Sequence, residues 1–339
     1  MKAVVVDSKI IDLFTGFDIE REIFAREGIE FAVENATGVD EYIRLCADAD
    51  ALLLIGLKTP KEVIERLPRC KAIVRYGVGY DAVDVESCSA SGIAVCNVPD
   101  AGTREVAGHA LALMLDCLRK TTYYDRQIRR GLWHGGSGYR LHRFSCLTVG
   151  LCGFGNIARA FASYASSLGC RIVAYDPFAP DDAFHNAGVE KVGFDELLAE
   201  CDVISIHIPL SAKTRHMFSK EQFAKMKPGM ILVNTSRGGV VNQEHLMDAL
   251  DDGTIAAAGL DVNEHEPLTD MDDRLLRYDT VVITPHCGAE SAEYFAALQE
   301  RAACTAVAVL RGELPSNTVN RDAILDYRSR NGYMEGDGK

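Results

Sequence analysis

Short apolar runs alternate with amphipathic segments along the first hundred residues of the chain. The runs are rich in Val, Ile, Leu and Ala, which is the pattern of strands that are buried on both faces. An alternation of strands and helices favours a parallel sheet, because each helix returns the chain to the edge where the next strand starts. We predict strands here at residues 3–6, 29–33, 51–55, 72–75 and 93–96.

A second alternation of the same kind begins near residue 148. It supplies six further strands for a doubly wound nucleotide-binding sheet, predicted at residues 148–152, 171–175, 203–206, 230–234, 256–260 and 281–284. Two long and mostly apolar helices are predicted at about 103–118 and 291–311. The predicted fold class is therefore α/β, with two Rossmann-like, doubly wound parallel-sheet domains.

The chain has 339 residues, more than a single hydrophobic core usually serves, so two domains are expected. The pattern changes near residues 99–102, and the long helix after residue 290 would return the chain to the first domain. We predict a discontinuous first domain from residues 1–101 and 290–330, and a second domain from residues 102–289. The polar tail at 331–339 is expected to be frayed.

The helix at 103–118 is apolar on more than one side, so it requires burial all round. Two explanations are open at this point, and they are compatible. The helix could be a core element between the two domains, or it could form part of a subunit interface. The adjoining segment at 121–145 is too long for a simple loop, which is consistent with an interface.

The composition of the chain limits the kinds of partner that the protein can bind and the cellular compartment that we expect for it. A net charge of −13 argues against a nucleic acid or an anionic membrane as partner, so an anionic substrate must be held by local cations. The cysteine count of eleven is odd and includes no Cys-x-x-Cys pair, which favours reduced, buried thiols in the cytoplasm. The chain starts directly with a strand and has no apolar run of 18 residues, so we expect a soluble intracellular protein.

A glycine-rich turn follows the strand at 148–152 and predicts a dinucleotide site. Gly153 permits the tight turn, Gly155 lets the backbone approach a pyrophosphate, and the small Ala158 lets the following helix pack on its strand. Asp176 ends the next strand, near the interval of about 20 residues at which a carboxylate meets the ribose hydroxyls. Because this charge repels a 2′-phosphate, NAD is favoured over NADP.

Three further reactive residues come directly after apolar strands, at the edge where open α/β sheets bind ligands. Arg237 could clamp a carboxylate with two parallel hydrogen bonds, His286 could exchange a proton with an alcohol, and Glu266 could orient that histidine. Each also has a structural explanation: an ion pair or cap for Arg237, a solvated loop acid for Glu266, and a hydrogen-bonded strand end for His286. The residues alone leave both open.

Taken in order, these residues resemble the D-isomer-specific 2-hydroxyacid dehydrogenases. The resemblance covers nearly the whole chain. It rests on Gly153-x-Gly155 with Asp176, Asn-Thr-Ser-Arg-Gly-Gly at 234–239, Asp-Val-x-x-x-Glu-Pro at 261–267, Thr-Pro-His at 284–286, and the first-domain segments 75–81 and 97–99.

The resemblance implies Arg237 as substrate clamp, His286 as acid/base and Glu266 as its partner. It implies a flavodoxin-like substrate domain, a separate NAD-binding Rossmann domain, and a homodimer built through residues 103–145. The residues that it places around NAD are Thr103, Gly153, Gly155, Asn156, Ile157, Asp176, Thr235, Asp261 and His286.

The first domain contains a second candidate anion-binding site. Arg75 ends a strand, and the backbone N–H groups of the following loop around Val78 and Gly79 could bind the substrate carboxylate together with it. The alternative is that Arg75 pairs with Asp81 or Asp84. In the linker, His134, His142 and the pair Arg129-Arg130 match no metal-ligand spacing, so we predict no metal site. We expect His109, in the long helix, to be structural.

The expected function is reversible hydride transfer between NADH and a small 2-oxo acid. Two other functions are kept open by similar branches: an NAD-sensing corepressor of the C-terminal binding protein type, and a D-3-phosphoglycerate dehydrogenase. The chain departs from both. Ile55 and Gly56 lie where phosphoglycerate dehydrogenases place an Arg, and Ala289-Glu290 lie where the corepressors carry a Trp.

Overall fold

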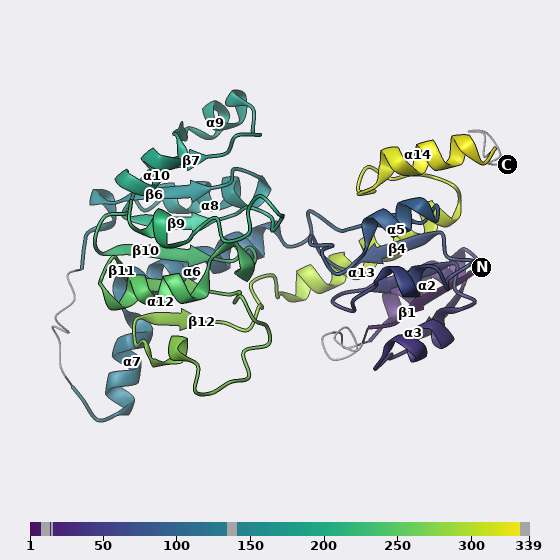
Figure 1. Ribbon diagram of the computed structural model, residues 1–339, viewed down its shortest axis with the longest axis horizontal. Helices are drawn as coiled ribbons and strands as arrows, with labels where there is room; N and C mark the ends of the chain where they lie inside the picture. The colour runs from purple at the N-terminus through teal and green to yellow at the C-terminus, as the bar shows by residue number, and fades with distance from the viewer. Residues whose placement is uncertain (8–13, 15, 134–140, 333–339) are drawn as a thin grey trace. The chain divides into compact units, whose positions relative to one another are not determined.

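A computed structural model describes residues 1–7, 14, 16–133 and 141–332. The predicted frayed tail at 331–339 lies almost wholly outside these residues, as does His134. The chain divides into two compact units, one made of Met1–Gly102 and Ser291–Lys339 and the other of Thr103–Glu290 (Figure 1). The first unit is therefore discontinuous in sequence, and each unit has its own parallel sheet.

The first unit contains a five-stranded sheet in the order β2-β1-β3-β4-β5. All of its pairs are parallel, and this is the flavodoxin-like order. The strands are β1 (Lys2–Val5), β2 (Glu30–Val33), β3 (Ala51–Leu54), β4 (Ala72–Arg75) and β5 (Ala94–Cys96). The helices are α2 (Asp18–Arg26), α3 (Val39–Cys46), α4 (Lys61–Ile64), α5 (Val85–Ala90), α13 (Ala292–Leu310) and α14 (Arg321–Arg330).

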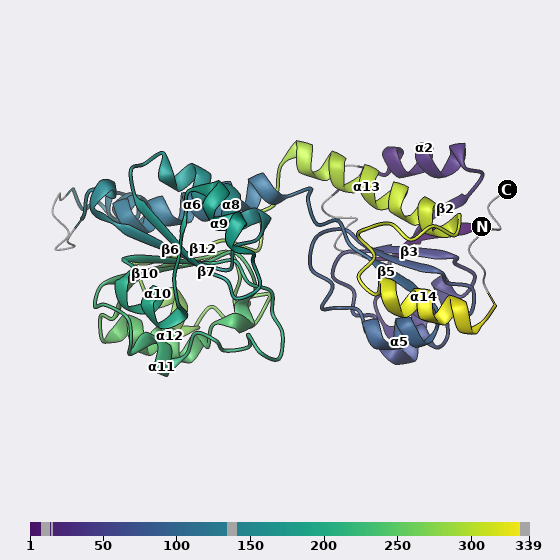
Figure 2. The ribbon, with the colours of Figure 1, turned by 90° about the horizontal axis from the view of Figure 1, so that it is seen from above.

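Alternate residues of these strands enter two separate cores. Ala3 and Val5 pack with α2 and α13, whereas Val4 and Val6 pack with α3, α4 and α5. Figure 2 shows α2 and α13 on one side of the sheet and α5 with α14 on the other. Because both faces are covered, the strands can be apolar throughout, which is why they could be predicted from continuous hydrophobic runs in the sequence.

The second unit contains a seven-stranded parallel sheet in the order β12-β11-β10-β9-β6-β7-β8. This is the Rossmann order with one added edge strand. The strands are β6 (Thr148–Cys152), β7 (Arg171–Tyr175), β8 (Glu190–Lys191), β9 (Val203–Ile206), β10 (Met230–Asn234), β11 (Ile255–Leu260) and β12 (Val281–Ile283). The prediction of six strands was wrong, because the sheet has a seventh strand, β8. Both residues of β8 are charged and exposed, so they give no hydrophobic run.

Helices cover both faces of this second sheet, and Figure 2 shows α6 and α8 opposite α10, α11 and α12. The helical elements are α6 (Thr103–Arg119), α7 (Thr121–Arg129), η1 (Phe144–Cys146), α8 (Asn156–Ser166), α9 (Asp181–Ala187), α10 (Phe194–Glu200), α11 (Lys220–Phe223), η2 (Gly238–Val240), α12 (Gln243–Asp251) and η3 (Arg274–Arg277). The prediction of two Rossmann-like α/β domains is confirmed.

Helix α6 belongs to the core of the second unit. Its residues Ala107, Ala110, Leu113, Met114 and Cys117 are buried in one cluster with strand residues of that unit. At Gly259 of β11 a Cβ would lie 2.8 Å from Leu113 Cβ, so this glycine lets the helix approach the sheet closely. The apolar character of α6 is thus explained within one unit, an alternative that the sequence pattern did not suggest.

The cysteines are all free thiols, and most of them are buried. The prediction of buried thiols is wrong for Cys146 and Cys304, which are exposed, and holds only in part for Cys287. Among the described residues, we find no helix with the length and apolar character needed to span a bilayer.

Candidate active site

The predicted chemistry lies at one edge of the second sheet. Strands β6, β7, β10, β11 and β12 run parallel, so their carboxyl ends meet at the same edge. Gly153, Asp176, Thr235, Asp261 and Thr284 each follow one of these ends directly. Open α/β sheets bind ligands at this edge.

The glycine turn after β6 has the backbone geometry that a phosphate site needs. Gly153 has a φ of 95°, and a Cβ there would lie 2.7 Å from the carbonyl oxygen of His207. Gly155 is the N-cap of α8, and no described atom lies within 4 Å of where its Cβ would be. Space is therefore open beside the first turn of α8, which includes Asn156 and Ile157, and the N-terminus of a helix is a position that favours an anion.

Asp176 accepts hydrogen bonds from three backbone N–H groups, one in the glycine turn and two just after Asp176 in the sequence. The donors are Phe154, at 2.8 Å from Oδ2, and Phe178 and Ala179, at 2.8 and 3.1 Å from Oδ1. Thr235 Oγ1 is buried without a hydrogen-bond partner among the described residues, and a buried polar atom of this kind fits a bound polar group. These residues together fit a dinucleotide. Thr103 starts α6 at the boundary of the unit.

His286 and Glu266 form a hydrogen-bonded pair. His286 Nδ1 lies 2.8 Å from Glu266 Oε2, and the other oxygen of Glu266 accepts from the backbone N–H of Asn263 at 2.9 Å. Burial would raise the pKa of Glu266, but the hydrogen bonds from His286 and Asn263 and the charges of His286 and Arg237 lower it. Glu266 is therefore a carboxylate, which can only accept, so the proton is on Nδ1 and Nε2 is left for a reacting group.

Arg237 is brought beside this pair by a close backbone contact. It is the N-cap of η2, and its Nη1 donates to the carbonyl oxygen of Ser236 at 2.8 Å. At the next residue, Gly238, a Cβ would lie 1.8 Å from the carbonyl oxygen of Asn263. The loop that carries Glu266 thus lies directly on Gly238, which only a residue without a side chain permits.

Asp261 anchors the turn that carries His286. Its carboxylate accepts from Thr284 Oγ1 at 2.6 Å and from the backbone N–H groups of Cys287 and Gly288 at 3.0 and 2.9 Å. Burial alone would raise the pKa of Asp261, but these bonds and one from His109 lower it to about 2. Both oxygens of Asp261 are committed to this turn.

In the first unit, Arg75 binds the loop that follows its own strand. Its Nε donates to the carbonyl oxygen of Gly79 at 2.9 Å, and its Nη1 donates to the carbonyl oxygen of Leu54 at 3.3 Å. Arg75 is buried, whereas Val78 at the tip of the loop is 46% exposed. Arg75 therefore supports the loop whose N–H groups were predicted to bind the substrate.

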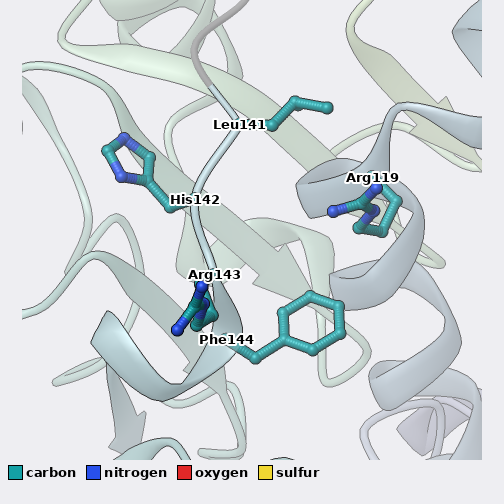
Figure 3. Close-up of a pocket in the computed structure, with 5 residues that line it drawn as sticks. All are labelled: Arg119, Leu141, His142, Arg143 and Phe144. Atoms are coloured by element: carbon teal, nitrogen blue, oxygen red, sulfur yellow. The ribbon is translucent and has the colours of Figure 1, made fainter.

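A basic surface pocket of about 340 Å³ lies away from this edge (Figure 3). Arg119 ends α6, and Leu141, His142, Arg143 and Phe144 precede β6. These positions come before the amino end of the strand, opposite to the glycine turn, so this pocket is separate from the predicted chemistry.

Comparison with known proteins places the chain in a family. Residues 111–288 match the model described as "D-isomer specific 2-hydroxyacid dehydrogenase, NAD binding domain". The chain belongs to the D-isomer specific 2-hydroxyacid dehydrogenases. It is an NAD-dependent oxidoreductase that acts on the CH–OH group of 2-hydroxy acids, so the predicted family, activity class and cofactor are confirmed.

Individual relatives carry several enzyme names. A glyoxylate reductase of Korarchaeum cryptofilum is 39% identical over 284 residues, which are 82% of this chain and 84% of that protein. A D-3-phosphoglycerate dehydrogenase of Methanocaldococcus jannaschii is 39% identical over 86% of this chain, which spans only 56% of that longer protein. The crystal structure of a D-lactate dehydrogenase of Aquifex aeolicus, complexed with NAD and lactic acid, superposes with a TM-score of 0.81 at 25% identity, covering 92% and 96% of the two chains.

Two contacts of the dehydrogenase were missed by sequence reasoning. Thr284 and His109 are hydrogen-bonded to each other at 2.9 Å beside Asp261. A second histidine–carboxylate pair joins His216, which has a φ of 53°, to Glu264, two residues before Glu266. Polar residues within apolar or glycine-rich segments were the only signal in the sequence, and they do not reveal which of them meet in the fold.

We expect Asp261→Asn to destabilise the second unit of the dehydrogenase. Because the folded pKa of about 2 lies below the ordinary value, the carboxylate contributes stability that is fully present above about pH 4 and lost as the pH falls through 2. This contribution is on the order of 2 kcal/mol, and the Asn amide would also turn a donor toward backbone N–H groups. At pH 7 the melting temperature should fall by about 4–8 °C.

The control is Asp182→Asn, which removes an exposed carboxylate of α9. Both variants are compared with the wild type by thermal melting at pH 7. Equal melting temperatures for all three proteins would show that the Asp261 carboxylate does not hold the turn.

Proposed function

We propose that the enzyme reduces a small 2-oxo acid with NADH, using Arg237, Glu266 and His286. The observation that carries the proposal is the 2.8 Å hydrogen bond between His286 and Glu266, formed where the charge of Arg237 acts on the same carboxylate. A histidine held by a carboxylate and an arginine at one sheet edge are suited to proton exchange and carboxylate binding, respectively.

In this proposal the guanidinium of Arg237 binds the substrate carboxylate through its planar fork. Arg75, Val78 and Gly79 of the first unit also bind the substrate, which makes that unit the substrate-binding domain and the second unit the NAD-binding domain. Arg75 and Arg237 supply local positive charge for an anionic substrate, although the net charge of the whole chain is −13.

His286 moves the proton. With Nδ1–H donated to Glu266, Nε2 is the atom that can protonate the carbonyl oxygen in reduction or accept a proton from the alcohol in oxidation. When bound, NADH supplies the hydride for C2 of the substrate. Glu266 fixes the tautomer and stabilises the charged imidazole.

Asp176 is proposed to select NAD over NADP. Thr103, Gly153, Gly155, Asn156, Ile157, Thr235 and Asp261, with His286, make up the rest of the proposed cofactor site. Replacing Asp176 by Ala should relax the preference, because a carboxylate at the end of β7 repels a 2′-phosphate. The ratio of kcat/KM with NADH to that with NADPH should fall at least tenfold, and an unaltered ratio would count against the assignment.

Arg237→Lys tests the clamp. A lysine keeps the charge but cannot form two parallel hydrogen bonds to a carboxylate, so KM for the 2-oxo acid should rise about tenfold or more. The control is Arg44→Lys, at an exposed position on α3 away from these residues in the sequence. Wild-type kinetics for Arg237→Lys would mean that the carboxylate is bound elsewhere.

We also propose a cytoplasmic homodimer with residues 103–145 at the interface. Helix α7 buries none of its residues, and Ile128, Leu132 and Trp133 at its end are exposed, Trp133 by 84%. Apolar side chains exposed in this way support an interface with a second copy. Residues 134–140 of the segment lie outside the described part of the chain. The free thiols support a reducing compartment.

The deciding experiment measures NADH oxidation at 340 nm with a panel of 2-oxo acids that includes glyoxylate, pyruvate, hydroxypyruvate and phosphohydroxypyruvate. Rapid turnover of one acid would establish the activity and its substrate. NADH binding without turnover of any acid would overturn the proposal in favour of an NAD-sensing binding protein.

A further inference from the structure

A chain of hydrogen bonds joins α6 to the turn that carries His286. His109 Nε2 lies 2.9 Å from Thr284 Oγ1, which in turn lies 2.6 Å from Asp261 Oδ1. The three residues come from distant parts of the sequence: the middle of α6, the end of β12 and the end of β11. They lie side by side in the fold and are separate from the pair formed by His286 and Glu266.

The direction of each hydrogen bond follows from the groups present. The ionised carboxylate of Asp261 can only accept, so Thr284 must donate its single hydroxyl hydrogen to it. Toward His109 the same hydroxyl can then only accept, so His109 Nε2 carries a proton. His109 Nε2 therefore donates to Thr284, which donates to Asp261, and the same His109 Nε2 also lies 3.4 Å from Asp261 Oδ1.

Asp261 uses both its side chain and its main chain to hold the turn. Its carboxylate accepts from the N–H groups of Cys287 and Gly288, and its carbonyl oxygen accepts from the N–H of His286 at 2.8 Å. The turn needs this support because His286 has a φ of 57°, in the left-handed region that is unfavourable for residues with a side chain. Such a conformation persists only where the surroundings determine it fully.

We propose that His109 and Thr284 are positioning residues for His286, acting through Asp261. By fixing the carboxylate of Asp261, they hold the backbone of His286 in the conformation that directs its ring toward Glu266. The proposal rests on the proposed role of His286 in proton transfer, because only then does the placement of the ring affect the reaction.

Metal binding is the other chemistry that this cluster suggests. The ligand atoms of His109, Asp261 and Cys287 lie within 4.8 Å of one another. The hydroxyl of Thr284 is hydrogen-bonded to two of these three atoms, so a cation between them would have to displace it. The existing hydrogen bonds already engage the ligand atoms of His109 and Asp261, which favours the positioning role.

Two matched pairs of variants test the proposal. Thr284→Val removes the hydroxyl at nearly constant shape, and Thr284→Ser keeps it. His109→Leu removes the donor, and His109→Gln places an amide N–H near the position of Nε2. The control for loss of a buried hydroxyl is Thr59→Val, because Thr59 is buried in the first unit, 3.0 Å from Tyr42 Oη.

Each variant is assayed for kcat and for the KM of the 2-oxo acid, and its histidine ring signals are recorded by NMR. The chain has nine histidines, and the His286 signal is assigned by its loss in His286→Gln. Thr284→Val and His109→Leu should lower kcat by about 10- to 100-fold, as expected for a misplaced catalytic group, and should shift or broaden the His286 signal. Thr284→Ser and His109→Gln should restore both to within about threefold, and Thr59→Val should leave both unchanged.

The ring signal keeps this proposal distinct from the proposed function. If the wild type turned over no 2-oxo acid, the proposed function would fail, and the His286 signal would still decide the positioning role. An unchanged kcat and an unchanged signal in Thr284→Val and His109→Leu, with His286→Gln inactive, would overturn the positioning role and leave the dehydrogenase mechanism standing.

Discussion

Replacing His286 by Ala should lower kcat for reduction of the 2-oxo acid by about 10²- to 10⁴-fold, the range expected for the loss of a general acid. The structure gives the reason. Glu266 accepts the hydrogen bond from Nδ1–H of His286, so Nε2 of His286 is the atom left to exchange a proton with the substrate. NADH affinity, measured by fluorescence titration, should change much less than kcat.

The matched control is His185→Ala, which removes an exposed histidine of α9 and should leave kcat unchanged. Equal turnover by His286→Ala and the wild type would remove His286 from the mechanism. A loss of NADH binding as large as the loss in kcat would instead indicate that His286 acts mainly in cofactor binding rather than in proton transfer.

Gly238→Ala should abolish most of the activity and lower the melting temperature. The added Cβ would lie 1.8 Å from the oxygen and 2.0 Å from the carbon of the Asn263 carbonyl, so the backbone of one loop or the other must move. That movement would separate Arg237 from Glu266. A 1 Å misplacement of catalytic groups can cost about 10²-fold in rate, and we expect at least that loss in kcat/KM.

Gly108→Ala provides the comparison for this variant. Gly108 lies within α6, and no described atom beyond the helix backbone lies within 4 Å of its Cβ position, so alanine should be neutral or stabilising by up to about 1 kcal/mol. Activity and melting temperature are measured for both variants. Wild-type behaviour of Gly238→Ala would mean that the loops adjust without disturbing the site.

The strands could be predicted because burial on both faces leaves a continuous apolar run. Strands β4, β6 and β10 begin and end at the residues expected from the pattern. Strand β8 could not be predicted, since Glu190 and Lys191 are charged and exposed. It exists because both residues pair with β7 at the edge of the sheet.

Part of the chemistry of the site could be predicted from the sequence for a related reason. Parallel strands gather their carboxyl ends, so a reactive residue after each strand, such as Arg237 or His286, must lie at that edge. The hydrogen-bond network around Asp261 could not be predicted from the sequence. It depends on which turn of α6 faces β11, and that register is set by the close packing of Leu113 on Gly259. Tertiary packing of this kind leaves no local pattern.

The ribosome synthesises the second unit between the two parts of the first unit. Residues 103–290 are continuous, so the second unit can complete its core as it emerges. The face of β1 and β3 that carries Ala3, Val5 and Ala51 is covered by Leu298, Ala302 and Ala306 of α13, which is synthesised after the whole of the second unit. The sheet of the first unit therefore completes its core only after the second unit has been synthesised, and one of its apolar faces stays exposed until α13 arrives.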